Sequence, residues 1–272
     1  MKKLLAVLLA LTMLFALAAC GGQANKVIRI STTTSVNDSG LLPYLLPVFQ
    51  EATGYTVEVQ SAGTGAAIQK AVDGNADLIL VHSKASEETF IADGYGIERI
   101  PFMYNYFVVA GPKNDPAKIK GSATAAEAFS KIADKKASFV SRGDDSGTHK
   151  AELKIWGENI PDAEKDKWYI NAGQGMGACL TMASEKGAYC LTDKATFLSN
   201  KESLDLEIIL GEGEDMMNTY SLIECNPEKL DDINTEGAKA FIEWMTGDEA
   251  SALIAKYGEE QYGEALFYLI EE

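Results

Sequence analysis

The feature that most constrains the fold is a regular alternation of short apolar runs with helical segments, which begins near residue 26. Three runs rich in β-branched or apolar residues each precede a segment with helix-start and helix-stop signals. We therefore expect the order β-α-β-α-β-α, which predicts a parallel sheet covered by helices on both faces. The expected strands are 26–31, 55–61 and 76–83, and the expected helices are 39–54, with its two prolines early, 63–75 and 85–94.

A second round of the same alternation follows. Helices are expected at 122–137, 146–158 and 174–187, and strands at 138–140, 168–173 and 188–193. Two extended segments near 105–111 and 211–220 flank this round, and two helical segments end the chain. The paired extended segments predict two α/β domains, domain I from 27–110 and 212–272 and domain II from 111–211. The alternative is one large doubly wound domain.

The first residues have the composition of an export signal. Met1-Lys2-Lys3 precedes the apolar run LLAVLLALTMLFALAA, and Leu17-Ala18-Ala19-Cys20 has the pattern of a bacterial lipobox. We expect residues 1–20 to be a lipoprotein signal peptide, with Cys20 lipidated and residues 21–26 acting as a tether. This interpretation places the protein outside the cell, anchored by its lipid to the outer face of the cell membrane. The alternatives are an ordinary cleaved signal and an uncleaved anchor.

The chain is strongly acidic. Its 24 Lys and Arg residues stand against 40 Asp and Glu residues, which gives a formal net charge of −16. This balance argues against nucleic acids and anionic lipid surfaces as partners, and it requires any anionic ligand to be captured by local groups. No Cys or His spacing indicates a metal site, and we expect a monomer without a cofactor. Cys179, Cys190 and Cys225 could form one disulfide and leave one thiol, or all three could be buried free thiols.

Three loops between an expected strand and the following helix are rich in hydroxyl groups. They are 31–35 (STTTS), 61–65 (SAGTG) and 141–148 (SRGDDSGT). Each lies at the carboxyl end of a strand, where ligands bind in open α/β sheets, and each precedes a helix N-terminus with free N–H groups. Ser and Thr at such positions are often only helix caps. Because such loops occur in both halves of the chain, we expect them to face each other across an anion-binding cleft.

The third loop contains the only arginine between residues 112 and 210. Arg142 could present its guanidinium fork to an oxyanion, or it could form an ion pair with Asp144 or Asp145. We expect both aspartates to point away from the ligand and to brace the loop.

The same loop also permits a hydrolase that uses Asp144, Ser146 and His149. Ser146 and His149 stand three positions apart at a helix start, however, and the chain has no Gly-x-Ser-x-Gly motif. The other histidine, His82, is expected to lie far away in the first domain. The Arg-Gly-Asp tripeptide is too short to indicate an adhesion function.

Five stretches of the chain resemble the tungstate-binding components of ABC-type importers. They are TTTS, SAGTGAAIQKAVDGNADLILVHS, SRGDDSGTHKAEL, GMGACLTMASEKGAYCLTDKATFL and NTYSLIECNP, and the resemblance extends over nearly all of the chain after the signal. It implies a periplasmic-binding-protein fold of the second type, with two α/β domains, two crossover segments and a ligand cleft between the domains. It also implies a receptor, not an enzyme, which captures a tetrahedral oxyanion and delivers it to an ABC permease. The ligand-binding residues that the resemblance implies are Thr33, Thr34, Ser35, Ser61, Gly63, Thr64, Arg142, Ser146, Gly147 and Thr148.

The chemistry of the loops agrees with an oxyanion such as tungstate. A fully deprotonated dianion only accepts hydrogen bonds, whereas phosphate keeps a proton and needs an acceptor in its site. Receptors for molybdate, sulfate or phosphate remain alternatives, as does an extracytoplasmic hydrolase.

Overall fold

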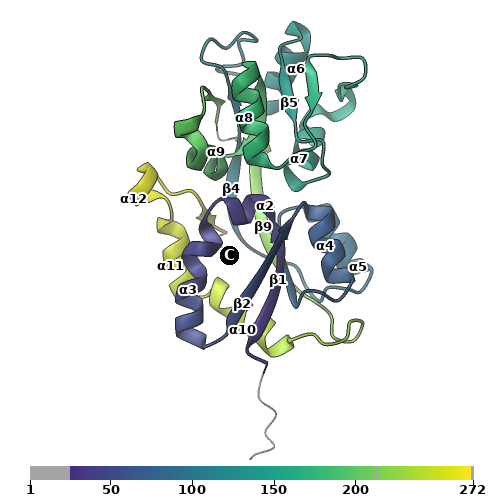
Figure 1. The fold of residues 1–272 in the computed structure, drawn as a ribbon, viewed down its shortest axis with the longest axis vertical. Coiled ribbons are helices and arrows are strands. Elements are labelled where there is room, and N and C mark those ends of the chain that lie inside the picture. The colour runs from purple at the N-terminus through teal and green to yellow at the C-terminus, as the bar shows by residue number, and fades with distance from the viewer. Residues whose placement is uncertain (1–24, 212, 271–272) are drawn as a thin grey trace, which may run out of the picture.

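The computed structural model describes residues 25–211 and 213–270. The expected signal peptide, Cys20 and most of the expected tether lie outside the described residues. Two lobes stand one above the other in Figure 1. We call them the N-terminal lobe (below) and the central lobe (above). Within the described part of the chain, no helix is both long and apolar enough to cross a membrane.

The N-terminal lobe is built from both ends of the described chain. Its elements are β1 (Val27–Thr33), α2 (Thr34–Asp38), α3 (Leu41–Thr53), β2 (Thr56–Ala62), α4 (Thr64–Val72), β3 (Leu78–Val81), α5 (Lys84–Ala92), α10 (Thr235–Thr246), α11 (Asp248–Lys256), α12 (Glu259–Tyr262) and β10 (Tyr268–Leu269).

The central lobe comes from the middle of the chain. Its elements are α6 (Ala125–Lys135), β5 (Phe139–Ser141), α7 (Gly147–Trp156), η2 (Gly157–Asn159), β6 (Tyr169–Asn171), α8 (Met176–Lys186), β7 (Tyr189–Asp193), α9 (Lys194–Asn200), η3 (Lys201–Ser203), β8 (Glu207–Leu210) and η4 (Glu214–Met216). Two long strands, β4 (Ile100–Gly111) and β9 (Met217–Glu224), run between the lobes (Figure 1).

The strands follow the order β2-β1-β3-β9-β4-β7-β5-β6. Strand β1 pairs in parallel with β2 and β3, and β5 pairs in parallel with β6 and β7. Strand β9 is antiparallel to both β3 and β4, and β4 is antiparallel to β7. The α/β fold class is therefore confirmed, and β1, β2 and β3 pair in parallel as expected, whereas β9, which comes late in the chain, joins the sheet antiparallel to β3.

Each lobe has its own hydrophobic core. The N-terminal lobe buries Phe49 and Phe241 against each other, with ring centroids 5.0 Å apart. The central lobe packs Phe129 on Trp156 with ring centroids 4.4 Å apart. Separate cores of this kind allow the lobes to keep their internal structure independently of each other.

Two local expectations need correction. Strand β1 does not end near Ser31 but continues to Thr33, because it stays in register with β2 up to the pair Thr33–Ala62. Pro47 is not in the first turn but inside α3. A proline there removes one helical hydrogen bond, and the burial of Leu45 and Phe49 on the same helix offsets the loss.

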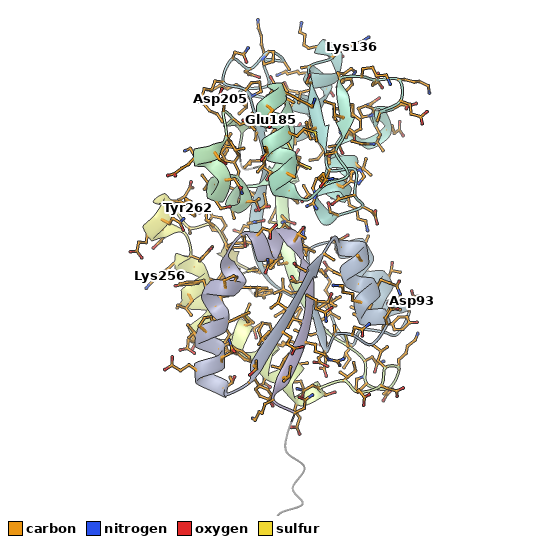
Figure 2. All side chains as sticks on the ribbon, in the orientation of Figure 1. Asp93, Lys136, Glu185, Asp205, Lys256 and Tyr262 are labelled. Carbon is orange, nitrogen blue, oxygen red and sulfur yellow. The ribbon has the colours of Figure 1, made fainter. Side chains whose placement is uncertain are left out.

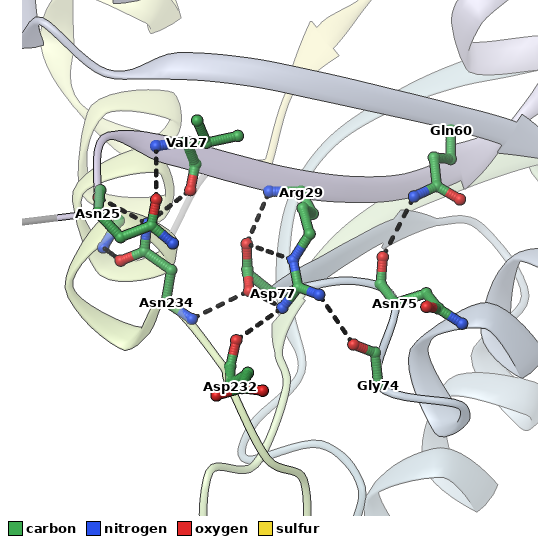
Figure 3. Close-up of polar contacts among 10 residues, drawn as sticks. Asn25, Val27, Arg29, Gln60, Gly74, Asn75, Asp77, Asp232 and Asn234 are labelled. Atoms are coloured by element: carbon green, nitrogen blue, oxygen red, sulfur yellow. Dashed lines mark hydrogen bonds and ion pairs between the residues drawn. The ribbon is translucent and has the colours of Figure 1, made fainter.

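A buried carboxylate ties the start of β1 to the start of α10 (Figure 3). Asp77 is fully buried and accepts hydrogen bonds from the backbone N–H of Arg29 at 2.7 Å and of Asn234 at 3.0 Å. Its other contact is the guanidinium of Arg29 at 2.6 Å. The side chain of Asn234 donates to the carbonyl of Val27 at 2.7 Å. The start of β1 and α10, which this network joins, lie at the end of the N-terminal lobe that is far from the central lobe (Figure 1).

Candidate anion-binding site

The first hydroxyl-rich loop crosses from β1 into α2, a short helix that faces the central lobe (Figure 1). Thr33 is the N-cap, and its Oγ1 accepts from the N–H of Val36 at 3.4 Å. Thr33 and Ser35 are almost completely buried, and their hydroxyl oxygens lie 3.1 Å apart. Thr34 is half-buried at the first position of the helix. The loop therefore turns two of its three predicted hydroxyl groups inward.

The second loop lies between β2 and α4 and contacts the central lobe. Gly63 is the N-cap of α4, and a Cβ atom there would lie 3.7 Å from the carbonyl oxygen of Asp144. Thr64 is fully buried. Ser61 is exposed in β2, so the structure does not bring it to the buried hydroxyl groups. Of the residues predicted from this loop, Gly63 and Thr64 lie at the junction of the lobes and Ser61 lies outside it.

The third loop leads from β5 into α7. Ser146 is the N-cap of α7, and its side chain accepts from the N–H of His149 at 3.2 Å. Ser146, Gly147 and Thr148 are all buried at this helix start. The N-terminus of a helix of this length offers free N–H groups and a partial positive charge.

Arg142 is buried and holds an ion pair within its own loop. Its Nη2 lies 2.5 Å from Oδ2 of Asp144, whose Oδ1 accepts from the N–H of Ser146 at 3.1 Å. Burial alone would raise the pKa of Asp144, but the hydrogen bonds from Ser146 and the charge of Arg142 outweigh it and hold the pKa below its ordinary value. Asp144 thus braces the loop as expected, and of the two alternatives for Arg142 the structure shows the ion pair, with Asp144 as its partner. Asp145 is largely exposed and lies 3.6 Å from Lys150.

Buried hydrogen-bond donors from both lobes at this junction have no partner among the residues that the structure describes. They include Oγ1 of Thr64, Nε of Arg142 and Oγ1 of Thr148. Buried polar atoms are nearly always hydrogen-bonded, so unpartnered ones call for a specific explanation. Since the three donors come from both lobes and from loops in mutual contact, a ligand that only accepts hydrogen bonds would satisfy them together.

His82 joins the first loop to the third, which the sequence did not lead us to expect. Its Nε2 lies 3.0 Å from the hydroxyl of Ser35, and its Nδ1 lies 2.8 Å from Oδ1 of Asn218. A Cβ atom on Gly147 would lie only 2.5 Å from Cε1 of His82. The expectation that His82 lies far from the third loop is therefore wrong. Its place right after β3, in line with the ends of β1 and β2, was the signal that could have revealed it.

The cluster of Asp144, Ser146 and His149 lacks the geometry of a hydrolase. The hydroxyl of Ser146 serves as a helix cap for the backbone N–H of His149, and Nδ1 of His149 accepts from the N–H of Asp145 at 3.1 Å. The imidazole is thus engaged with the backbone and not with the hydroxyl group that it would have to activate.

A buried carboxyl group supports the third loop from within the central lobe. Glu152 on α7 accepts from the hydroxyl of Tyr169 at 2.7 Å and from Nε1 of Trp156 at 3.1 Å. Burial raises the pKa of Glu152 to about 7, although these hydrogen bonds oppose the shift. The three cysteines that the structure describes, Cys179, Cys190 and Cys225, are buried free thiols.

A groove of about 850 Å³ opens between the lobes beside these loops. His82, Lys84 and Ser86 line it from the N-terminal lobe, and Gly147, Lys150 and Lys154 line it from the central lobe. The ammonium group of Lys150 reaches across to the hydroxyl of Ser86 at 3.2 Å.

A second hollow of about 700 Å³ lies between α9 and α12 and includes Tyr262, which is labelled in Figure 2. None of the predicted site residues lines the second hollow. Of the predicted site residues, Gly147 lines the groove beside His82.

Two lobes joined by two strands, with unpartnered buried donors from both lobes near their junction, are typical of a solute-binding protein of the periplasmic-binding-protein type. The profile of the PBP superfamily domain matches residues 21–249, so the chain belongs to this superfamily. A protein of Peptoclostridium acidaminophilum named tungstate-binding protein TupA is 47% identical over 281 aligned residues, which cover 98% of each chain.

Two solved structures agree with this relationship. The tungstate-binding protein TupA of Desulfovibrio alaskensis G20 is 38% identical, with a TM-score of 0.78 over 90% of this chain and 99% of that one. A structure described as the tungstate ABC transporter from Geobacter sulfurreducens is 42% identical, with a TM-score of 0.79 over 86% of this chain and 100% of that one. The chain is thus a member of the TupA family of binding proteins.

Proposed function

We propose that this protein is an extracytoplasmic receptor, not an enzyme, that captures tungstate between its two lobes and delivers it to an ABC permease. The observation that carries the proposal is the set of three unpartnered buried donors, Thr64 Oγ1, Arg142 Nε and Thr148 Oγ1. Relatives named for tungstate binding support the choice of ligand.

The distribution of acceptors favours a fully deprotonated anion. Asp144 is the carboxylate nearest to Arg142 in the loop, and both of its oxygens are already engaged, by Arg142 and by the N–H of Ser146. It is therefore a poor acceptor for the proton of a monohydrogen phosphate. A dianion such as tungstate needs donors alone, and the loops supply hydroxyl groups, N–H groups and one guanidinium.

The ligand contacts that we propose are the ten predicted residues without Ser61, which is exposed. They are Thr33, Thr34, Ser35, Gly63, Thr64, Arg142, Ser146, Gly147 and Thr148. An anion can bind to this acidic chain because Arg142 and the N-terminus of α7 provide positive charge at the site itself.

We assign the lobes to two domains with the boundaries 27–110 plus 212–272 and 111–211. The separate cores and the two connecting strands support this division, and the strands β4 and β9 provide the hinge about which the domains open. Polar contacts between the lobes in the arrangement observed include those of Lys150 with Ser86 at 3.2 Å and of Lys194 with Glu264 at 2.6 Å.

The proposed location rests on the sequence before residue 27. A lipidated Cys20 holds the monomeric receptor at the outer face of the cell membrane, next to its permease, and a tether from residue 21 to 26 gives it freedom to turn.

Native mass spectrometry and isothermal titration with tungstate, molybdate, sulfate and phosphate test the proposal. We expect one anion per chain, with tungstate bound most tightly, and loss of binding in Arg142→Ala but only a weakening in Arg142→Lys, which keeps the charge without the fork. Circular dichroism of both variants checks that the fold survives. Equal affinity for all four anions would contradict the tungstate assignment, and absence of binding for all four would contradict the receptor function.

A further inference from the structure

His82 is the centre of a hydrogen-bonded chain that runs from the anion site into the base of the cleft. Ser35 lies at one end of this chain, and Asn218 on β9 lies at the other. Nδ2 of Asn218 continues it to Oδ1 of Asn105 at 2.9 Å and to the hydroxyl of Tyr220 at 2.8 Å. This series of hydrogen bonds connects Ser35, a predicted ligand contact, with both strands of the proposed hinge.

The direction of this chain follows from the atoms involved. An amide oxygen only accepts, so the imidazole must donate from Nδ1 to Oδ1 of Asn218. A neutral ring then has no hydrogen on Nε2, which therefore accepts from the hydroxyl of Ser35. In this state the hydrogen of Ser35 is directed at His82 and is unavailable to an anion.

The surroundings keep the ring neutral as long as no anion is present. His82 is buried, and burial lowers its pKa to about 4; the hydrogen bond to Asn218 opposes the shift, and the charge of Arg142 adds to it. Gly147 places the positive end of α7 against the ring. Among the described residues that face His82, Arg142 carries a charge. Tyr220 is a titratable neighbour, and its ring centroid lies 5.0 Å from that of His82. The remaining neighbours, Ser35, Asn218 and Gly147, are uncharged.

We propose that His82 takes up one proton from solution when the anion binds, and that this proton reverses the hydrogen bond between His82 and Ser35. The imidazolium then donates from Nε2 to Ser35, and the hydroxyl of Ser35 turns its hydrogen to the anion. The positive charge of Arg142 alone opposes a second positive charge on His82. A doubly negative ligand beside Arg142 outweighs that charge and favours the imidazolium. His82 is thus a positioning residue, because it acts on the ligand through Ser35.

The inference rests on the proposed function and predicts a proton linkage. Isothermal titration with tungstate in two buffers of different ionisation enthalpy measures the protons taken up per anion. We expect an uptake of up to one proton, and an affinity that improves by as much as about tenfold for each unit by which the pH falls. His82→Gln keeps a hydrogen-bonding side chain but cannot ionise, and it should abolish both effects. His149→Gln is the matched control and should retain them.

The two histidines also allow a direct observation by nuclear magnetic resonance. In the free protein the ¹⁵N shifts of His82 should report a hydrogen on Nδ1 and none on Nε2. With saturating tungstate they should report a hydrogen on both nitrogens. A hydrogen on Nε2 in the free protein would overturn the proposal. Tungstate binding with no proton uptake, or with equal uptake in His82→Gln, would overturn it too while leaving the receptor function intact. Failure to bind any of the four anions would instead remove the proposed function itself.

Discussion

Gly147, at the start of α7, lies directly against the imidazole of His82 from the other lobe. A Cβ atom at position 147 would lie 2.5 Å from Cε1 and 2.9 Å from Nδ1 of that ring, closer than real Cβ contacts allow. The backbone at Gly147 is helical, so the position requires glycine for space and not for its conformational freedom. The contact therefore brings the start of α7 in the central lobe against a residue of the N-terminal lobe that lies outside the three predicted loops.

Gly147→Ala should therefore oppose closure of the lobes. Each lobe can still fold, because the added methyl group clashes with His82 of the other lobe. The lobes can then close only if His82 moves, and otherwise they remain partly open. We expect tungstate affinity to fall by about 10- to 100-fold, as measured by titration. Gly177→Ala, where the nearest atom to the new methyl group is 3.8 Å away, is the control and should bind like the original protein. Equal affinities in the two variants would show that the contact does not limit closure.

Removal of the unpartnered hydroxyl groups should raise the stability of the free protein but lower its affinity for the anion. Thr64→Val and Thr148→Val each remove a buried hydroxyl without a partner, so the free energy of unfolding without ligand should rise by about 1 kcal/mol. Affinity for the anion should fall by about 10- to 100-fold in each variant, since a hydrogen bond to a charged group is lost. Urea unfolding and titration measure the two effects.

Thr53→Val is the control for these variants. Its hydroxyl already donates to the carbonyl of Phe49 at 2.8 Å, on a helix away from the loops. The change should lower stability slightly and leave affinity unaltered. If Thr64→Val and Thr148→Val behaved in the same way, their hydroxyl groups would not contact the ligand.

The lysines along the groove should accelerate capture of an anion by an acidic protein. Lys154 is exposed on α7 and lines the groove, whereas Lys136 is exposed at the end of the central lobe far from it (Figure 2). Lys154→Gln should lower the association rate constant by about two- to fivefold at low salt, with little change at high salt or in the dissociation rate. Lys136→Gln changes the net charge equally and should have a smaller effect. Stopped-flow fluorescence over a range of ionic strengths tests this, and equal losses in the two variants would exclude local steering.

Glu152 should make the protein less stable as the pH rises. Its pKa is raised from 4.5 to about 7 in the folded protein, so the folded state binds the proton more tightly than the unfolded chain does. The resulting stabilisation is full below about pH 4.5 and is lost as the pH rises through about 7, with a total of about 3 kcal/mol. Glu152→Gln should remove this part of the pH dependence in urea unfolding between pH 5 and pH 8, and the exposed Glu158→Gln should not. An unchanged slope in Glu152→Gln would contradict the raised pKa.

Local patterns were sufficient to predict most helices and strands. The run around Leu78 to Val81 is apolar throughout because the strand is buried on both faces, and the helix from Thr64 follows a loop whose Gly63 becomes its N-cap. Such features depend on neighbours in the sequence, and they also located the three loops correctly.

The partners of residues distant in the sequence could not be predicted. The position of β9 between β3 and β4 and the contact of His82 with Gly147 depend on how distant segments of the chain assemble. The place of His82 right after a buried strand indicated the ligand-binding end of the sheet, but it did not show which loop of the other lobe would contact the imidazole. The exposure of Ser61 was likewise not predictable, because alternation within β2 puts it on the same side as the half-buried Val57 and Val59.

The position of β9 also sets the order in which the molecule can be completed during synthesis. Strands β1, β2 and β3 leave the ribosome early, but β3 keeps an open edge until Met217–Glu224 pairs with it. The central lobe, encoded between β4 and β9, is available first. The lobe that begins the chain is therefore finished last, and its sheet stays incomplete until most of the chain has been made.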